Sequence, residues 1–275
     1  DGWFRHLLVE IFSHQSRFTP LLRLGQFLRL FLFGSLRRKI PAYQRQKPWP
    51  ENSHTRKMIV LSGCVQAGIA PNINQATASV LDRLGIQLLD IAAAGCCGSI
   101  NHHAAMPDST AVFARNNIDA WWPAIEAGAE AIVVTASGCG VHIKDYGHLL
   151  RLDQRYAEKA KVVAALARDV GEVLAVEDLS KLDPKNTELR IAYHPPCTLQ
   201  HGQQLGGKVE ALLGQLGYQL VPFDEPHLCC GSAGTYSILQ PGIATQLRDR
   251  KLQAIQKGRP DILVTANIGC QVHLQ

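Results

Sequence analysis

Short runs of aliphatic and β-branched residues alternate with longer amphipathic stretches along most of the chain. Runs of this kind predict buried strands, at 58–62, 86–91 and 131–135 in the first half and at 190–193, 218–223 and 261–265 in the second. Strands that alternate with helical patterns are typical of βαβ units and a parallel sheet. We therefore predict an α/β fold of two tandem Rossmann-like lobes with parallel sheets, related by a pseudo-two-fold axis and preceded by an N-terminal helical segment.

A helix is predicted between the first two strands of each half. In the first half Asn72 is a candidate N-cap and Gly85 a candidate end, and the residues expected to face the core are Ile73, Ala76, Val80, Leu81 and Leu84. In the second half Gly217 ends a pattern formed by Val209, Leu212, Leu213 and Leu216.

The cysteines repeat in one order in the two halves. A lone Cys is followed 32 residues later by a Cys-Cys-Gly sequence, and a last Cys, with His three residues beyond it, comes 42 or 40 residues after the pair. The first set is Cys64, Cys96, Cys97 and Cys139, and the second set is Cys197, Cys229, Cys230 and Cys270. This match predicts a duplication. We expect cysteine-rich domains at 58–180 and 189–275, the second truncated at its C-terminus, after a basic amphipathic helical segment and linker at 1–57.

The lone cysteine, the adjacent pair and the last cysteine of a set each follow a different predicted strand. The carboxyl ends of parallel strands share one rim of a sheet, so each set is expected to meet at one site. Cysteine clusters in an intracellular protein of this size favour metal binding over disulfides. Four thiolates suit either an iron–sulfur cluster or structural zinc. Adjacent cysteines beside glycine favour the cluster, because neighbouring sulfurs can reach different metal atoms.

Three histidines are candidate cofactor-binding residues near these cysteines. His142 and His273 occupy equivalent places in the two halves, and His194 lies three residues before Cys197. His142 and His273 are each open to a role as metal ligand, as donor to a sulfur or a flavin-proximal group, or as packing residue, with a supporting role favoured over direct ligation, and His194 is expected to line the same rim. No catalytic residue is assigned.

The charge of the chain is concentrated at its start. Residues 1–57 hold eleven Lys and Arg against three Asp and Glu, whereas the remainder holds seventeen against twenty. This distribution gives no reason to expect nucleic acid as a partner. No apolar run is long enough for a transmembrane helix, so we expect a cytoplasmic protein, with a peripheral position on the inner face of the cytoplasmic membrane as the alternative. Because the chain begins at Asp1, we expect it to be a fragment.

The sequence resembles the tandem cysteine-rich CCG domains of the heterodisulfide reductase family and, more closely, the iron–sulfur subunits of the glycolate oxidase family. The resemblance covers about residues 58–275 and is carried by the segments Tyr193–Gly202 and Cys229–Tyr236. Heterodisulfide reductase motifs end in Cys-x-x-Cys, where this chain has His142 or His273. The ferredoxin module of the family, with its Cys-x-x-Cys-x-x-Cys-x-x-x-Cys-Pro run, is not found in this sequence.

The resemblance implies an oxidoreductase subunit that relays electrons. It would receive them from flavin-containing oxidase subunits that oxidise a 2-hydroxy acid and pass them toward membrane quinone, with the eight cysteines as ligands of iron–sulfur clusters, expected to be of the 4Fe-4S type. The absence of a Gly-x-Gly-x-x-Gly sequence places the oxidation itself on a partner subunit. The alternatives are a zinc-stabilised assembly scaffold and a redox subunit of the lactate-utilisation or heterodisulfide reductase type.

Residues 17–39 combine large apolar residues with arginines, including Arg23, Arg29 and the Arg37-Arg38-Lys39 cluster. They are expected to form a helix. It either packs on its own domain, or docks on the ferredoxin module or a flavin subunit, or lies on an anionic membrane, the last being the least favoured.

Overall fold

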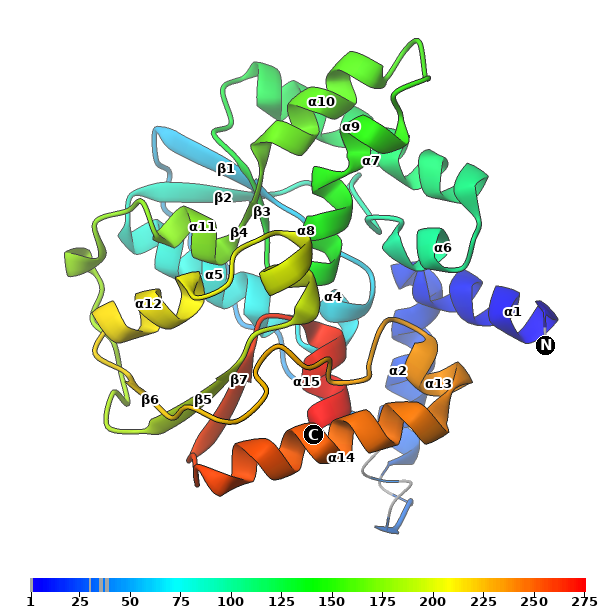
Figure 1. Ribbon diagram of the computed structural model, residues 1–275. Helices are drawn as coiled ribbons and strands as arrows, with labels where there is room; N and C mark the ends of the chain where they lie inside the picture. The colour runs from blue at the N-terminus through cyan, green and yellow to red at the C-terminus, as the bar shows by residue number, and fades with distance from the viewer. Residues whose placement is uncertain (1, 30, 35–36, 38–39) are drawn as a thin grey trace. The chain divides into compact units, whose positions relative to one another are not determined.

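The structure is a computed structural model that describes residues 2–29, 31–34, 37 and 40–275 (Figure 1). The elements up to residue 166 are α1 (Gly2–Phe12), α2 (Gln15–Leu28), β1 (Arg56–Val60), α4 (Val65–Ile69), α5 (Asn72–Arg83), β2 (Ile86–Asp90), α6 (Ser99–His103), α7 (Pro107–Glu126), β3 (Ile132–Val134), α8 (Ser137–Lys144), α9 (Tyr146–Leu149) and α10 (Ala157–Leu166).

The remaining elements repeat this alternation of strand and helix. They are β4 (Ala167–Asp169), α11 (Val170–Leu174), a 3₁₀ turn (Leu179–Lys181), β5 (Arg190–His194), a π-helical turn (Thr198–Gly202), α12 (Lys208–Gln215), β6 (Gln219–Leu220), α13 (Tyr236–Leu239), α14 (Pro241–Lys257), β7 (Ile262–Thr265) and α15 (Ile268–Leu274).

Two sheets form the centre of the fold. Their strand orders are β2-β1-β3-β4 and β6-β5-β7, so the first strand of each half lies between the second and the third. β1 pairs in parallel with β2, and β5 pairs in parallel with both β6 and β7. The predicted α/β class with parallel sheets is confirmed. The pseudo-two-fold relation of the lobes stays a prediction.

The strands differ from the predicted ones in two places. β6 is only Gln219–Leu220, much shorter than the predicted 218–223. β4 was not predicted at all, because Ala167-Arg168-Asp169 has no β-branched residue and follows α10 without a turn signal. A strand this short is set by its neighbour in the sheet and not by local preference.

The chain divides into two compact units. The first unit comprises residues 1–132 and 142–166, and the second comprises 133–141 and 167–275. The short segment 133–141, which contains Cys139, therefore belongs with the second half of the chain.

In the first unit β1 is buried along its carboxyl half, at Met58, Ile59 and Val60. The long helix α7 adds Ile118 and Trp121, both fully buried, to the same core. A core of this kind holds the strand ends, and the loops that leave them, in fixed positions.

The helix α5 differs from the predicted helix in its N-cap and in its buried face. Its N-cap is Pro71, and Asn72 lies inside the helix, where its side chain accepts from Lys47 N–H and donates to Arg45 C=O. Leu81 and Leu84 are buried as predicted, whereas Ala76 is exposed and Ile73 and Val80 are only half-buried. The buried face contains Asn74, Thr77 and Ala78 instead. The prediction failed because polar residues that bond within the unit take inward positions.

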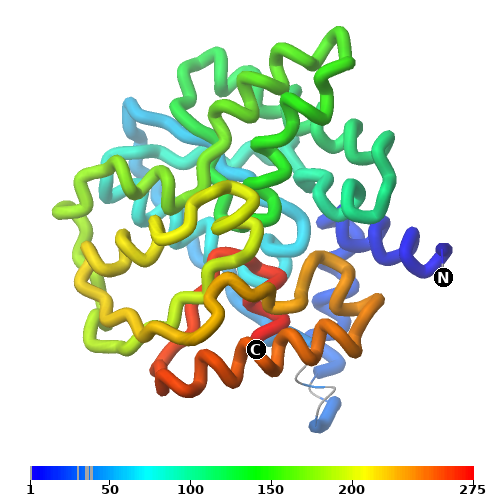
Figure 2. The backbone as a smooth tube through the Cα atoms, in the orientation of Figure 1, coloured from blue at the N-terminus to red at the C-terminus, as the bar shows by residue number. Residues whose placement is uncertain are grey.

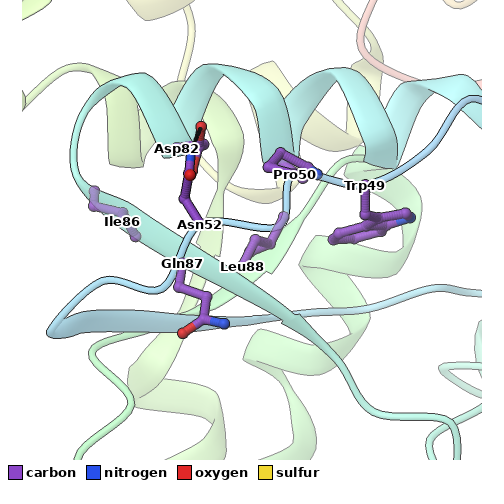
Figure 3. Close-up of a pocket in the computed structure, with 8 residues that line it drawn as sticks. Trp49, Pro50, Asn52, Asp82, Ile86, Gln87 and Leu88 are labelled. Carbon is purple, nitrogen blue, oxygen red and sulfur yellow. Dashed lines mark hydrogen bonds between the residues drawn. The ribbon is translucent and has the colours of Figure 1, made fainter.

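The linker before β1 packs against the same helix. Asp82 accepts hydrogen bonds from Asn52 at 2.9 Å and pairs with His54 at 2.8 Å. Beside this clasp is a small pocket of about 30 Å³, lined by linker residues and by α5 and β2, with Trp49 and Leu88 among them (Figure 3). The pocket holds no more than about one water and contains no cysteine.

Among its described residues, the N-terminal segment contains the helices α1 and α2. α2 covers only part of the predicted range 17–39, and residues 30, 35, 36, 38 and 39, including Arg38 and Lys39, lie outside the described residues. Over the part of the chain that the structure describes, none of the helices combines the length and the apolar character needed to cross a membrane.

In the second unit Figure 1 draws α12 (yellow) and α14 (orange) on opposite sides of the strands β5, β6 and β7. The segment between β6 and α13, which the tube in Figure 2 follows, is irregular and carries Cys229 and Cys230.

Candidate functional site

Every cysteine lies just beyond the carboxyl end of a strand. Cys64 follows β1, the Cys96-Cys97 pair follows β2, and Cys139 is in α8 after β3. Cys197 follows β5, the Cys229-Cys230 pair follows β6, and Cys270 is in α15 after β7. The structure describes all eight, and each is a thiol. Each set thus occupies the rim at which open α/β sheets bind their ligands.

The first unit brings three thiols of the first set together. The Sγ atoms of Cys64 and Cys96 are 3.3 Å apart, and Cys64, Cys96 and Cys97 are all buried. Hydrogen bonds from Cys64 and then Cys97 hold the pKa of the Cys96 thiol well below its usual value. The backbone N–H of Gly98 also donates to this sulfur, at 3.4 Å. Cys96 therefore accepts most of the hydrogen bonds within the group.

Cys139, the fourth member of the first set, is half-buried and belongs to the second unit. The turn before it is fastened there, because Ser137 N–H donates to Ala266 C=O at 3.0 Å and Ser137 Oγ shares a hydrogen bond with Thr198 Oγ1 at 2.8 Å. Asn267 Nδ2 also donates to Ser137 Oγ.

The second unit gathers all four thiols of its set. Cys230 and Cys270 have their Sγ atoms 3.1 Å apart and are buried. A hydrogen bond from Cys197 holds the pKa of the Cys229 thiol far below its usual value, and Cys230 donates to the same sulfur. Gly231 N–H donates to Cys229 Sγ at 3.3 Å. Cys229 therefore corresponds to Cys96: in each unit the first cysteine of the pair collects the donors.

Glycine is required after each pair. Gly98 and Gly231 have φ values of +88° and +90°, in the left-handed region. A Cβ at Gly231 would lie 2.6 Å from Ala244 C=O, and one at Gly98 would lie 3.3 Å from Thr110 C=O. In each turn the N–H of the glycine donates to the sulfur of the first cysteine of the pair.

The three predicted histidines differ in their surroundings. His142 and His194 are buried, and the Nε2 atom of each has no hydrogen-bond partner among the described residues. Burial lowers the pKa of His142 to about 4, with contributions from His102 and His103, so the ring is neutral near pH 7. Burial, followed by the charge of Lys251, lowers the pKa of His194 to about 4. His273 instead contacts Ala244 C=O through Nε2 at 3.1 Å.

Two further residues hold the cysteine turns. In the first unit Asn117 accepts from Gly95 N–H and donates to Cys96 C=O, both at 2.8 Å. In the second unit Lys251 Nζ donates to Glu225 C=O at 2.5 Å and to Pro226 C=O at 3.3 Å. Sequence reasoning missed both, although they follow the two cysteine pairs by 20 and 21 residues.

The sulfur atoms of these cysteines limit the cofactors that the two clusters can bind. Clustered cysteines, five of the eight buried and two accepting a backbone N–H, fit an iron–sulfur cluster, whose potential such N–H groups tune. Thiolates also bind zinc. Within the described ranges, no three His, Cys, Asp or Glu side chains are arranged as ligands around one metal ion, and the closest sulfurs contact one another.

Comparison with known proteins agrees with this arrangement. The model of the cysteine-rich domain family, CCG, matches residues 58–144 and 191–275, so the chain belongs to this family of tandem cysteine-rich domains. The chain is 49% identical to the glycolate oxidase iron-sulfur subunit of Escherichia coli K12, over 98% of this chain and 66% of that protein. The predicted resemblance is confirmed.

Two more distant relatives extend the comparison. The chain is 26% identical to a probable glycolate oxidase iron-sulfur subunit of Bacillus subtilis 168, over 80% of this chain and 49% of that protein. It is 33% identical to lactate utilization protein A of Geobacillus thermodenitrificans, over 74% of this chain and 83% of that protein. The chain thus spans about two thirds and about half of the two glycolate oxidase subunits.

Proposed function

We propose that the chain is the iron–sulfur electron-transfer part of a glycolate oxidase complex. In this proposal it takes electrons from flavin-containing subunits that oxidise a 2-hydroxy acid and passes them toward membrane quinone. The observation that carries the proposal is the second unit, where four cysteines from three strand ends come together as thiols. The names of the relatives, iron-sulfur subunits of glycolate oxidase, support the same class of cofactor and partner.

The eight cysteines are the proposed ligands, four for each set, in domains with the limits 58–180 and 189–275. A bound iron–sulfur cluster, proposed to be of the 4Fe-4S type, supplies one-electron storage and transfer. The residues of the chain hold its ligands: Gly98 and Gly231 donate backbone N–H groups to sulfur, and the surrounding core excludes water. The Nε2 atoms of His142 and His194 have no hydrogen-bond partner among the described residues and are proposed to support the cluster ligands, whereas His273 contacts Ala244 C=O.

The test is the content of metal and acid-labile sulfide per chain after anaerobic purification, with a visible spectrum before and after dithionite. Iron and sulfide in near-stoichiometric amounts, with a brown colour that bleaches, are expected. Zinc without sulfide would overturn the proposal and support the assembly scaffold, because zinc has no redox chemistry.

The N-terminal helices support a docking role toward a partner in the same complex. α2 packs against α4, where a Cβ at Gly68 would lie 3.1 Å from Phe18 and 3.4 Å from Leu22, and it exposes Leu21, Leu24 and Leu28 along another stripe. We assign this stripe to a protein partner, either a flavin subunit or the ferredoxin module. Peripheral contact with a membrane is the alternative, and sedimentation with anionic vesicles in the absence of partner subunits would favour it.

A further inference from the structure

The helices α7 and α14 have the same position relative to the two cysteine pairs. Both begin with proline at N1 or N2, at Pro107 and Pro241. Three residues later, Thr110 and Ala244 present their carbonyl oxygens to Gly98 and Gly231. Each unit therefore packs the first turn of a long helix against the turn that follows its Cys-Cys pair.

Asn117 and Lys251 lie about two turns beyond Thr110 and Ala244, on the same face of their helices. Both are 1% exposed and both bond the backbone of the segment that leads into the cysteine pair. Asn117 binds one N–H and one C=O, whereas Lys251 binds two C=O groups. The two residues thus hold equivalent backbone segments by hydrogen bonds, but Asn117 is neutral whereas Lys251 is cationic.

Lys251 Nζ donates to the carbonyl of Pro226, three residues before Cys229, so its charge lies at the segment that carries the second cysteine pair. Burial lowers the pKa of Lys251, while the charges of Cys230, Glu225 and Cys229 raise it. Lys251 in turn lowers the pKa of His194. Its ammonium also lies 5.4 Å from the centre of the Phe223 ring. A charge screened so little by water acts strongly on its neighbours.

We propose that Asn117 and Lys251 are matched positioning residues, and that the charge of Lys251 makes the iron–sulfur group of the second set the more easily reduced of the two. The inference rests on the proposed function, because it concerns a bound cluster. Reduction adds one electron, supplied by a flavin-containing partner, and forms or breaks no bond. The added negative charge is stabilised by a nearby cation, which raises the reduction potential. Asn117 offers no such charge to the first set.

The first experiment measures potentials on the full chain with its clusters reconstituted anaerobically. A potentiometric titration followed by electron paramagnetic resonance compares the unsubstituted chain with Lys251→Met, and a Cys97→Ser variant identifies the signal of the second group. Lys251→Met is expected to lower the potential of the second group and leave that of the first unchanged. Lys257→Met removes the same charge from an exposed position of α14 and is expected to change neither. Equal potentials in Lys251→Met and the unsubstituted chain would overturn the charge assignment.

The second experiment tests the mechanical role on the chain without metal. Loss of the two hydrogen bonds frees the segment before Cys229, so Lys251→Met is expected to raise the rate of alkylation of Cys229 by roughly fivefold and leave Cys96 unchanged. The Lys251→Gln variant keeps a hydrogen-bond donor without the charge. Its Cys229 is expected to be alkylated more slowly than that of Lys251→Met. The potential of its second group is expected to be as low as in Lys251→Met. Equal alkylation rates in all chains would overturn the positioning role.

The two experiments separate the inference from the function on which it rests. A chain that binds no iron fails the proposed function, yet its alkylation rates still test the role of Lys251. If the chain binds two clusters but their potentials do not change when Lys251 is replaced, the proposed function stands and the inference is wrong.

Discussion

The first and second cysteine sets share the bonding pattern at the first cysteine of each pair and differ in what surrounds it. In each unit the first cysteine of the pair receives hydrogen bonds from a thiol and from the glycine two residues later. The buried histidine, however, comes from α8 in the first unit, as His142, and from the end of β5 in the second, as His194. The residue that holds the turn is neutral in one unit and cationic in the other. The donors to this cysteine are therefore alike in the two units, whereas the charge of the residue that holds the turn differs.

The largest effect is expected from removing one ligand in each set. Cys97→Ser should lose the iron of the first set and keep that of the second, and Cys230→Ser should do the reverse, because each pair supplies ligands to its own site. Iron and sulfide analysis of the two variants measures this. Complete loss of iron from either single variant would show that the two sites do not form independently.

The next effect compares the two glycine turns. Gly231→Ala should lower the free energy of unfolding by about 2–4 kcal/mol, and Gly98→Ala by about 1–2 kcal/mol. Both changes strain a left-handed backbone, but only at 231 would the new Cβ meet a carbonyl oxygen at 2.6 Å. Urea unfolding of both variants provides the values. Gly68→Ala is a control at which φ is not positive and side chains alone must give way. An equal loss of unfolding free energy in Gly98→Ala and Gly231→Ala would mean that α14 moves away from the new Cβ as easily as α7 does.

A smaller effect separates the two histidines that the repeat makes equivalent. His273→Leu should cost about 1 kcal/mol in the metal-free chain, because Ala244 C=O loses its partner. His142→Leu should cost less or be neutral, since it removes a buried nitrogen without a hydrogen bond. Urea unfolding measures both. A greater loss for His142→Leu would contradict the unpaired state of Nε2.

The smallest effect concerns the clasp at Asp82, away from the cysteines of the first unit. The hydrogen bond from His54 and then that from Asn52 lower the pKa of Asp82 below 3.8, with burial opposing them. A depressed carboxyl pKa adds stability above the unfolded value, and this stability is lost as the pH falls through the folded value. Asp82→Asn should therefore be less stable by about 0.5–1 kcal/mol at pH 6, and the difference should vanish below the folded pKa of Asp82. Unfolding curves at several pH values test this. A difference that grows on acidification would reverse the sign of the pKa shift.

Some elements of the fold and site follow from local pattern. Most of the predicted strands are present, because buried aliphatic runs constrain residue type directly, although β6 is shorter than predicted and β4 was not predicted. The inward face of α5 was predicted less well, since Asn74 and Thr77 are satisfied by hydrogen bonds that hydrophobic periodicity does not reveal.

The sequence by itself determined that the chain has two similar α/β halves with four cysteines at the strand ends of each. Only the tertiary structure decided that Cys139 belongs to the second unit, that His142 and His273 have different partners, and that Asn117 and Lys251 hold the cysteine turns. The physical reason is that the spacing of the cysteines is set by the lengths of the segments between them, which can be read from the sequence. The partner of a helical side chain, by contrast, depends on which distant backbone its helix packs against.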